Sequence, residues 1–262
     1  MILKIRGLFC EARWAQTSGR GDQMMMKYGI VAALLCAMVN VAAADTVRFK
    51  AADNVTVTAD TGGSGNGPVI VLFHMAGASR GEYRDIAPKF HALGYRTLAV
   101  DQRSGGSFNN VANQTAAGVG SDPGFEAAIP DLKAAVGYAR DVMGAGSVGV
   151  LGSSYSASLV LVLAGRDAGF ADVVMSFSPG EYFSNRKLVS TAAARITVPV
   201  FLTAARSEQG QIAPLANAIP GSDQVFAPKG GGRHGASSLF SADADEYWTA
   251  LQGFLAANFP SG

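Results

Sequence analysis

The feature that most constrains the fold of this chain is an alternation of short, continuous apolar runs with amphipathic stretches of helical period. The apolar runs are Val69 to Phe73, Thr97 to Val100, Val148 to Leu151, Val173 to Phe177, Val200 to Thr203 and Gln224 to Phe226. Strands of this kind are buried on both faces, as in a parallel sheet. The amphipathic stretches are Glu82 to Leu93, Phe125 to Met143, Ser156 to Ala168, Asn185 to Ala193, Ile212 to Ala218 and Ala244 to Asn258. The alternation predicts an α/β fold, with a mostly parallel central sheet and helices on both faces.

The region before these runs has a different pattern. Thr46 to Lys50 and Asn54 to Thr58 alternate polar and apolar residues, which predicts two half-buried antiparallel strands. The glycine-rich run 62–67 follows them and is expected to be a flexible turn. No Gly-Lys-Ser or Gly-Lys-Thr ends that run, so it does not match a phosphate-binding loop. No break in composition and no internal repeat divides residues 45–262, so we expect one domain there.

The first 44 residues are predicted to be an N-terminal extension and a cleavable signal peptide. Lys27 precedes an apolar stretch from Tyr28 to Val39, and Ala42-Ala43-Ala44 supplies small residues for cleavage after Ala44. The apolar stretch is shorter than the ~20 residues that a membrane-spanning helix needs. We therefore expect a periplasmic or secreted protein with no stable membrane insertion after cleavage. An uncleaved anchor and lipid attachment at Cys36 are the alternatives, and translation starting within Met24–Met26 would shorten the extension.

Composition narrows the possible functions. The chain has 262 residues, of which 48% are hydrophobic and 16% charged, as in a globular rather than a disordered protein. Cleavage after Ala44 removes five of the 21 basic and two of the 20 acidic residues, leaving 16 and 18. It also removes both cysteines, Cys10 and Cys36, so the core alone must stabilise the mature protein. No cluster of Lys and Arg is present to bind phosphates, which argues against a nucleic-acid partner.

The strongest chemical motif lies where an apolar run meets a helix of small residues. Val148 to Leu151 leads into Gly152-Ser153-Ser154-Tyr155-Ser156, a Gly-x-Ser-x-Ser sequence. A sharp strand-to-helix turn around a nucleophilic serine needs small residues two places before and after it, to avoid a clash within the turn. The turn also places Ser154 at a helix N-terminus, where N–H groups can stabilise an oxyanion. The motif alone is also compatible with a serine-rich turn that has no catalytic role.

A serine hydroxyl needs an imidazole to accept its proton and a carboxylate to orient that imidazole. Of the three histidines, His234 lies in the glycine-rich segment 230–235 that follows a late strand. Glu208 comes just after the run Val200 to Thr203 and is the predicted carboxylate, with Asp223 as the next candidate. Ser154, Glu208 and His234 thus each follow the carboxyl end of a strand, the edge where open parallel sheets place their sites.

Together these residues resemble the α/β-hydrolase superfamily, and most nearly its small esterases that are similar to dienelactone hydrolase. The resemblance covers about residues 46 to 260 and implies an α/β-hydrolase fold with no large lid. In this family the acid usually stands nine places after a proline, as Glu208 does after Pro199. Dienelactone hydrolases themselves use a cysteine nucleophile where this chain has Ser154, and Ser156 replaces the more common glycine.

The resemblance also implies an oxyanion hole built from two backbone N–H groups. One belongs to Tyr155, the residue after the nucleophile. Matching His74-Met75-Ala76 to the family's His-Gly-x assigns the second to Ala76, with Met75 as the alternative. His74 is then expected to shape the loop by bonding backbone groups, whereas His91 is expected on a helix surface.

Two further features are open to two interpretations. Asp101-Gln102-Arg103 resembles the family's Asp-x-Arg-x-x-Gly turn. We expect structural contacts there, between Asp101 and Arg103 or from Arg103 to carbonyls, with a substrate carboxylate as the alternative partner of Arg103. The aromatic residues Phe108, Tyr182 and Phe183 are candidates for the wall of an acyl pocket or for ordinary packing.

The resulting hypothesis is a serine hydrolase that cleaves a small-molecule carboxylic ester by acyl transfer through Ser154, His234 and Glu208. A peptidase or amidase with the same three residues, or a noncatalytic envelope binding protein of the same fold, remains an alternative. We predict no metal and no cofactor, because no histidine pair has ligand spacing and no cysteine is left after cleavage. The sequence does not indicate an oligomeric state.

Overall fold

The apolar runs of the sequence form one mixed sheet in the computed structural model, which describes residues 45–121, 123–221 and 225–262. Within these ranges the sheet has eight strands in the order β1-β2-β4-β3-β7-β8-β9-β10. Their bounds are β1 (Asp45–Lys50), β2 (Thr56–Gly62), β3 (Val69–Phe73), β4 (Arg96–Asp101), β7 (Val148–Ser153), β8 (Val173–Phe177), β9 (Val200–Thr203) and β10 (Val225–Phe226). The predicted signal peptide, residues 1–44, lies outside the described residues.

The two strands nearest the N-terminal edge differ from the rest in direction. β1 pairs antiparallel with β2, and β2 pairs antiparallel with β4. Every pair from β4 to β10 is parallel, which confirms the prediction of a mostly parallel sheet. The strand order reverses around β3, because the chain passes from β3 to β4 on one side and then crosses to β7 on the other. Such a reversal opens a crevice at the carboxyl edge of a sheet.

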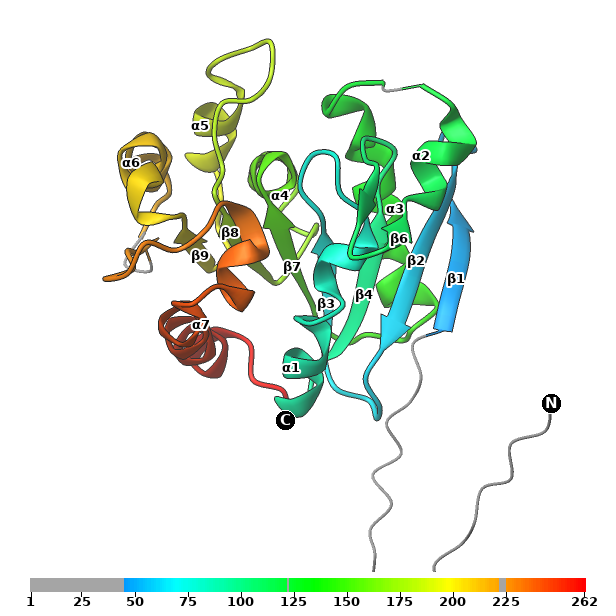
Figure 1. Ribbon diagram of the computed structural model, residues 1–262, viewed down its shortest axis with the longest axis horizontal. Helices are drawn as coiled ribbons and strands as arrows, with labels where there is room; N and C mark the ends of the chain where they lie inside the picture. Colours follow the sequence, from blue (N-terminus) through cyan, green and yellow to red (C-terminus); the bar gives the residue numbers. More distant parts are fainter. Residues whose placement is uncertain (1–44, 122, 222–224) are drawn as a thin grey trace, which may run out of the picture. The chain divides into compact units, whose positions relative to one another are not determined.

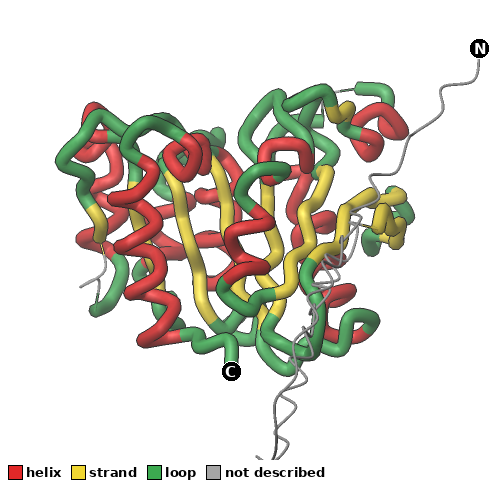
Figure 2. The backbone as a smooth tube through the Cα atoms, turned by 60° about the horizontal axis from the view of Figure 1, so that its bottom comes forward, coloured by secondary structure: helices red, strands yellow, loops and turns green. Residues whose placement is uncertain are grey.

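Helices cover both faces of this sheet (Figure 1). Their bounds are α1 (Ala87–Ala92), α3 (Ile129–Asp141), α4 (Tyr155–Arg166), α5 (Leu188–Ala193), α6 (Gln209–Ala218) and α7 (Ala244–Asn258). One apolar cluster joins α1 and α7 to one face of the strands, and a second joins α3, α4, α5 and α6 to the other. Successive strand residues point to opposite faces, so continuous apolar runs supply both clusters. Figure 2 shows the strands in yellow, side by side among the red helices.

Two regions differ from the sequence-based expectation. The single helix predicted from Glu82 to Leu93 is divided into a 3-10 turn, η1 (Arg80–Tyr83), and α1, which has Pro88 in its first turn. The segment 103–124, to which the sequence analysis assigns no helix or strand, contains the hairpin β5 (Ser107–Phe108) and β6 (Val111–Ala112) and the short helix α2 (Gln114–Val119). These elements are too short to show a period. Among the described residues, no helix has the length and apolar character to cross a membrane.

The histidine of α1 is not the surface residue that the sequence predicts. His91 is half-buried, and its Nε2 lies 2.8 Å from the Thr97 hydroxyl oxygen. A Cβ atom on Gly62 would lie 2.5 Å from the His91 ring, so the glycine leaves the space that the ring occupies. Gly62 of β2 has no side chain, which explains how the His91 imidazole packs there although it lies on the polar face of its helix.

The turn after β4 is structural, but its ion pairs differ from the predicted one. Asp101 accepts hydrogen bonds from the backbone and side chain of Arg80, at 2.8 and 2.6 Å, and not from Arg103. The guanidinium of Arg103 instead pairs with Asp131 of α3 and with Asp53, at 2.7 and 2.5 Å. Because both edges of that guanidinium already hold carboxylates, Arg103 fixes the loop to α3, and the predicted Asp101–Arg103 pair is wrong.

Candidate active site

The register of the parallel strands brings the predicted site residues to one edge. Phe73 at the end of β3 pairs with Gly152 of β7, Ser153 pairs with Phe177 of β8, and Phe177 pairs with Thr203 of β9. The loops that leave these strands therefore start side by side. They carry the predicted oxyanion loop, the predicted nucleophile and the predicted acid, and they meet at the point where the strand order reverses.

Ser154 lies on a strained turn between β7 and α4. Its φ and ψ are 60° and −121°, a conformation that non-glycine residues rarely adopt. Two contacts hold it there: the Ser154 N–H donates to the Phe177 carbonyl at 2.8 Å, and Gly152 lets the helix pack close behind the turn. A Cβ on Gly152 would lie 2.5 Å from the carbonyl carbon of Ser156. Any side chain at position 152 would therefore clash with the backbone of α4, which explains the glycine of the Gly-x-Ser-x-Ser motif.

Replacing Gly152 by alanine should therefore displace the turn. The added methyl meets backbone atoms, which cannot rotate away, so we expect a loss of about 1–3 kcal/mol in the free energy of unfolding. A shift of about 1 Å at Ser154 should also lower turnover about 100-fold. Gly137→Ala is the matched control, because a Cβ at Gly137 in α3 meets nothing within 4 Å. Urea unfolding and ester turnover of both variants test this, and equal behaviour would contradict it.

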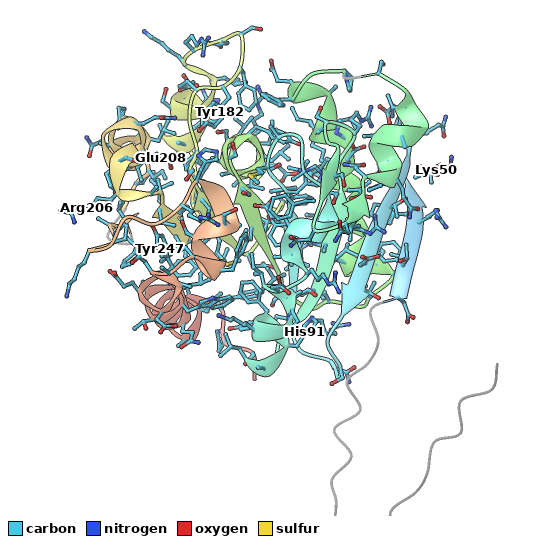
Figure 3. The ribbon with its side chains drawn as sticks, viewed as in Figure 1. Lys50, His91, Tyr182, Arg206, Glu208 and Tyr247 are labelled. Atoms are coloured by element: carbon cyan, nitrogen blue, oxygen red, sulfur yellow. The ribbon has the colours of Figure 1, made fainter. Side chains whose placement is uncertain are left out.

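The three predicted catalytic side chains come together at hydrogen-bond distance. His234 Nε2 lies 2.7 Å from Ser154 Oγ, and His234 Nδ1 lies 2.6 Å from Glu208 Oε1. Glu208 is an acceptor only, so Nδ1 carries the proton and Nε2 accepts from the serine hydroxyl. Figure 3 shows Glu208 and Tyr182 at the same edge, well separated from His91. The arrangement matches the order of contacts through which an imidazole activates a serine.

Glu208 ends the 3-10 turn η3 (Arg206–Glu208) and has several partners besides the imidazole. Its Oε2 accepts from the Ser178 hydroxyl at 2.6 Å and from the Ala205 N–H at 3.2 Å. Arg206 donates to the Lys229 carbonyl instead of pairing with Glu208. The alternative acid Asp223 lies outside the described residues.

The ionisation of this pair follows from its contacts. The hydrogen bond to Glu208 and the charge of that carboxylate raise the pKa of His234 above its ordinary value, although burial acts to lower it. Burial acts to raise the pKa of Glu208, but hydrogen bonds from His234 and Ser178 outweigh it and hold the pKa below the ordinary value. Both shifts favour a carboxylate beside an imidazole that readily accepts a proton.

Two serine hydroxyls hold the loop after His234. The Gly235 N–H donates to Ser178 Oγ at 2.9 Å, and the Ala236 N–H donates to Ser153 Oγ at 2.9 Å. Gly235 has a φ of 65°, and a Cβ there would lie 2.3 Å from Ser153 Oγ, so only glycine fits. The loop is thereby fixed to the ends of β7 and β8, and the imidazole is fixed with it.

The predicted oxyanion loop is fixed as firmly as the histidine loop. His74 is fully buried, its Nε2 accepts from the Gln102 N–H at 3.1 Å, and its Nδ1 donates to the Met75 carbonyl at 2.8 Å. Burial lowers the pKa of His74 to about 4, so the ring is neutral. The expected loop-shaping role of His74 is confirmed. Ser156 Oγ donates to the His74 carbonyl at 2.6 Å, a contact that glycine could not make.

The two candidate positions for the second oxyanion donor differ in their contacts. The Met75 N–H donates to Glu82 Oε2 at 2.7 Å, so it is already engaged. Ala76 follows directly and is exposed. Tyr155 is the first residue of α4, and its hydroxyl donates to the Ser104 carbonyl at 3.0 Å. Ala76 therefore stays the predicted second donor, beside Tyr155.

Sequence reasoning missed three residues that support this site, namely Glu82, Ser153 and Ser178, because their contacts join segments far apart in the chain.

Of the aromatic candidates, Phe183 is buried in the core and Phe108 packs against Phe240. The Tyr182 hydroxyl donates to the Ser178 carbonyl at 3.0 Å, which leaves it nearest to the site. In the described ranges, no group of three or more His, Cys, Asp or Glu side chains is arranged to hold a metal ion.

Comparison with solved structures identifies proteins of similar fold. Solved structures similar to the chain include an esterase from Pyrococcus furiosus, at 19% identity and a TM-score of 0.66, covering 82% of this chain and 92% of that one. They also include a dienelactone hydrolase from Anabaena variabilis, at 16% identity and a TM-score of 0.64, covering 82% and 98%. An acylaminoacyl peptidase from Pyrococcus horikoshii has 15% identity and a TM-score of 0.62, and the match covers 83% of this chain and 42% of the peptidase.

These likenesses establish the α/β-hydrolase fold, without a large lid, that the sequence predicts. No curated protein sequence matches the chain. The model of the dienelactone hydrolase family matches residues 55–219, a range that includes Ser154 and Glu208 and ends before His234. That match spans most of the described chain. The protein is therefore a hydrolase that belongs to the dienelactone hydrolase family.

Proposed function

We propose that this protein hydrolyses small carboxylic esters by acyl transfer, with Ser154 as nucleophile, His234 as general base and acid, and Glu208 as the group that orients the imidazole. The observation that carries the proposal is the continuous contact from Ser154 Oγ through both nitrogens of His234 to Glu208, at 2.7 and 2.6 Å. Membership of the dienelactone hydrolase family and the likeness to esterases favour an ester as the bond that is cleaved.

In the proposed reaction, Ser154 Oγ attacks the ester carbonyl carbon while His234 Nε2 takes the hydroxyl proton. The carbonyl oxygen becomes an oxyanion that the N–H groups of Tyr155 and Ala76 stabilise. The tetrahedral intermediate collapses, the alcohol leaves with the proton from His234, and an acyl ester on Ser154 remains. Water then attacks that ester with His234 as base, and the carboxylic acid and the free serine are formed.

An amide could react through the same steps, and one structural neighbour is an acylaminoacyl peptidase. The test is a panel of p-nitrophenyl esters and aminoacyl arylamides, run in parallel on the mature protein starting at Asp45. Turnover of short-chain esters with little arylamide cleavage supports the proposal, and the reverse preference would replace it with a peptidase.

A fluorophosphonate probe gives an independent readout, because it labels a serine only where a base has activated it. We expect labelling of the wild-type protein and none of Ser154→Ala. A well-folded protein that resists the probe and cleaves no substrate would instead support the noncatalytic binding protein.

Export to the periplasm or the medium is part of the proposal and is supported by the signal-like sequence of residues 1–44. The first strand begins at Asp45, so cleavage after Ala44 would leave every described element whole. Cell fractionation with mass measurement of the processed chain tests this. An N-terminus at Asp45 in the exported fraction is expected, and a full-length chain in the cytoplasm would contradict it.

The contacts of His234 also predict how activity depends on pH. The neutral imidazole is the active form, so kcat/KM should rise with pH around a midpoint above the ordinary histidine pKa of about 6.5. Glu208→Gln removes the carboxylate that contributes most to raising this pKa, and the charge of Glu82 remains. The midpoint should therefore move to lower pH, and turnover should fall by up to about 10⁴-fold.

A pH profile of kcat/KM for both proteins measures this shift. Glu126→Gln, which changes an exposed carboxylate in η2 (Glu126–Ala128), is the control and should leave the midpoint in place. If Glu208→Gln kept full activity while Asp223→Asn lost it, Asp223 would be the acid.

A further inference from the structure

A second carboxylate, Glu82, lies beneath the proposed site and takes no direct part in the proposed reaction. Glu82 belongs to η1, directly after the oxyanion loop, and its side chain is 0% exposed. Both of its oxygens are engaged: Oε2 accepts from the Met75 N–H at 2.7 Å, and Oε1 accepts from the Ser153 hydroxyl at 2.7 Å. A buried carboxylate is costly to desolvate, so a hydrophobic residue would be the simpler choice if packing were its only purpose.

The contacts of Glu82 extend to the histidine loop. Ser153 Oγ donates to Glu82 and accepts from the Ala236 N–H at 2.9 Å. Ser153 directly precedes the proposed nucleophile, Met75 directly precedes the proposed oxyanion donor Ala76, and Ala236 lies two residues after His234. One carboxylate therefore joins the three segments that carry the nucleophile, the oxyanion donor and the base.

Ser178 makes an equivalent connection on the other side of the imidazole. Its hydroxyl donates to Glu208 at 2.6 Å and accepts from the Gly235 N–H at 2.9 Å. The histidine loop is thus held by two hydroxyls, each oriented by a different carboxylate. Glu208 contacts the imidazole directly, whereas Glu82 acts through the backbone on either side.

We infer that Glu82 is a positioning residue for the reaction, and this inference rests on the proposed function. Glu82 holds the Met75 N–H close to the Ser153 hydroxyl. Met75 precedes Ala76 and Ser153 precedes Ser154, so Glu82 sets the direction of the Ala76 N–H relative to the attacking oxygen. Oxyanion donors stabilise the transition state only when they are aimed at the position that the oxyanion will occupy. Glu82 should therefore affect kcat strongly and substrate binding weakly.

The arrangement requires a group that only accepts hydrogen bonds. The Met75 N–H and the Ser153 hydroxyl both donate hydrogen bonds to Glu82, and the Ala236 N–H donates a hydrogen bond to Ser153 Oγ. In Glu82→Gln the carbonyl oxygen can serve only one of the two donors. If it serves Met75, the amide NH₂ faces Ser153 Oγ and cannot accept from it, so the serine proton loses its acceptor. If it serves Ser153, the NH₂ opposes the Met75 N–H, so either orientation shifts one of the loops.

Burial raises the pKa of Glu82 to about 7, although the hydrogen bonds from Ser153 and Met75 and the charge of His234 act to lower it. Burial outweighs these donors, so the carboxylate form that the contacts require is present above a pH of about 7 and is lost as the pH falls.

The experiment compares wild type, Glu82→Gln, Ser153→Ala and the exposed-carboxylate control Glu126→Gln. For each, kcat and KM are measured on one p-nitrophenyl ester, together with inhibition by a trifluoromethyl ketone, whose tetrahedral adduct with Ser154 places an oxyanion in the hole.

Removing an oxyanion donor lowers kcat by about 10²–10³-fold in comparable enzymes. We expect Glu82→Gln to lower kcat about 10- to 100-fold, to change KM less than about threefold, and to weaken the ketone by the same factor as kcat. Ser153→Ala should do the same to a smaller degree, and Glu126→Gln should match wild type.

Circular dichroism and thermal unfolding establish that each variant is folded at the assay temperature. A folded Glu82→Gln with wild-type kcat overturns the inference, as does a kcat loss that the ketone affinity does not follow. If Glu82→Gln fails to fold, Ser153→Ala decides, because it removes only a hydroxyl. An unchanged kcat then overturns the inference, and a lowered kcat at constant KM supports it.

A wild-type protein that neither cleaves the ester nor reacts with the probe contradicts the proposed function, and the inference with it. An active wild type with an unaffected Glu82→Gln contradicts the inference alone.

Discussion

Ser154→Ala should lower kcat for ester hydrolysis by about 10⁶-fold, and His234→Ala should cost nearly as much. Without the Ser154 hydroxyl there is no oxygen to form the acyl intermediate, and without the imidazole the hydroxyl keeps its proton. Because the two atoms act through one contact of 2.7 Å, the double variant should be barely slower than either single variant. Turnover of a p-nitrophenyl ester, corrected for the background rate in buffer, measures all three.

The matched control is Ser207→Ala, which changes an exposed serine one residue before Glu208. It should retain wild-type turnover, because a nearby hydroxyl as such contributes nothing to the reaction. Additive losses from Ser154→Ala and His234→Ala would show that the two residues act independently, which contradicts a shared proton transfer. Full activity of a folded Ser154→Ala would place the nucleophile elsewhere.

Asp131→Ala should be the most destabilising single change that we predict, at about 3–5 kcal/mol in the free energy of unfolding. The Asp131 side chain is 0% exposed and accepts from the backbone N–H of Arg103 at 2.9 Å and from its guanidinium at 2.7 Å. Removing it leaves the charge of Arg103 buried without its main partner. It also releases the loop after β4 from α3.

Asp53→Ala tests the same guanidinium from its exposed side. Asp53 is 42% exposed and pairs with Arg103 at 2.5 Å. Solvent screens this pair, so its loss should cost less than about 1 kcal/mol. Urea unfolding of both variants distinguishes the two environments. Equal losses would mean that burial of Asp131 is not what makes its contact important.

The parts of the fold that follow from local pattern were predictable. β3, β8, β9 and α7 have the bounds that the sequence indicates, because continuous apolar runs and a long amphipathic period leave few alternatives. The meeting of Ser154, Glu208 and His234 was expected from their places just after strands. In the structure the parallel register aligns those strand ends, which brings the three side chains to one edge.

The contacts between distant segments could not be predicted in this way. Whether Asp101 pairs with Arg103 or with Arg80 depends on how η1 packs over β4, and nothing in the turn itself distinguishes the two. Glu82 was predicted only as the first residue of the helix from Glu82 to Leu93, and an acidic residue in such a stretch is normally solvated. Its burial follows from the split of that helix and from donors that lie 7 and 71 residues away.

The spacing of the site along the chain has a consequence for biogenesis. Ser154 and His234 are 80 residues apart in the sequence, and Glu82 and Ser153 are 71 residues apart. Contacts of such long range form only when most of the domain has condensed, so an unfinished or translocating chain should be inert. Recovery of hydrolysis during refolding would thus report the last step of assembly, later than signals from individual helices.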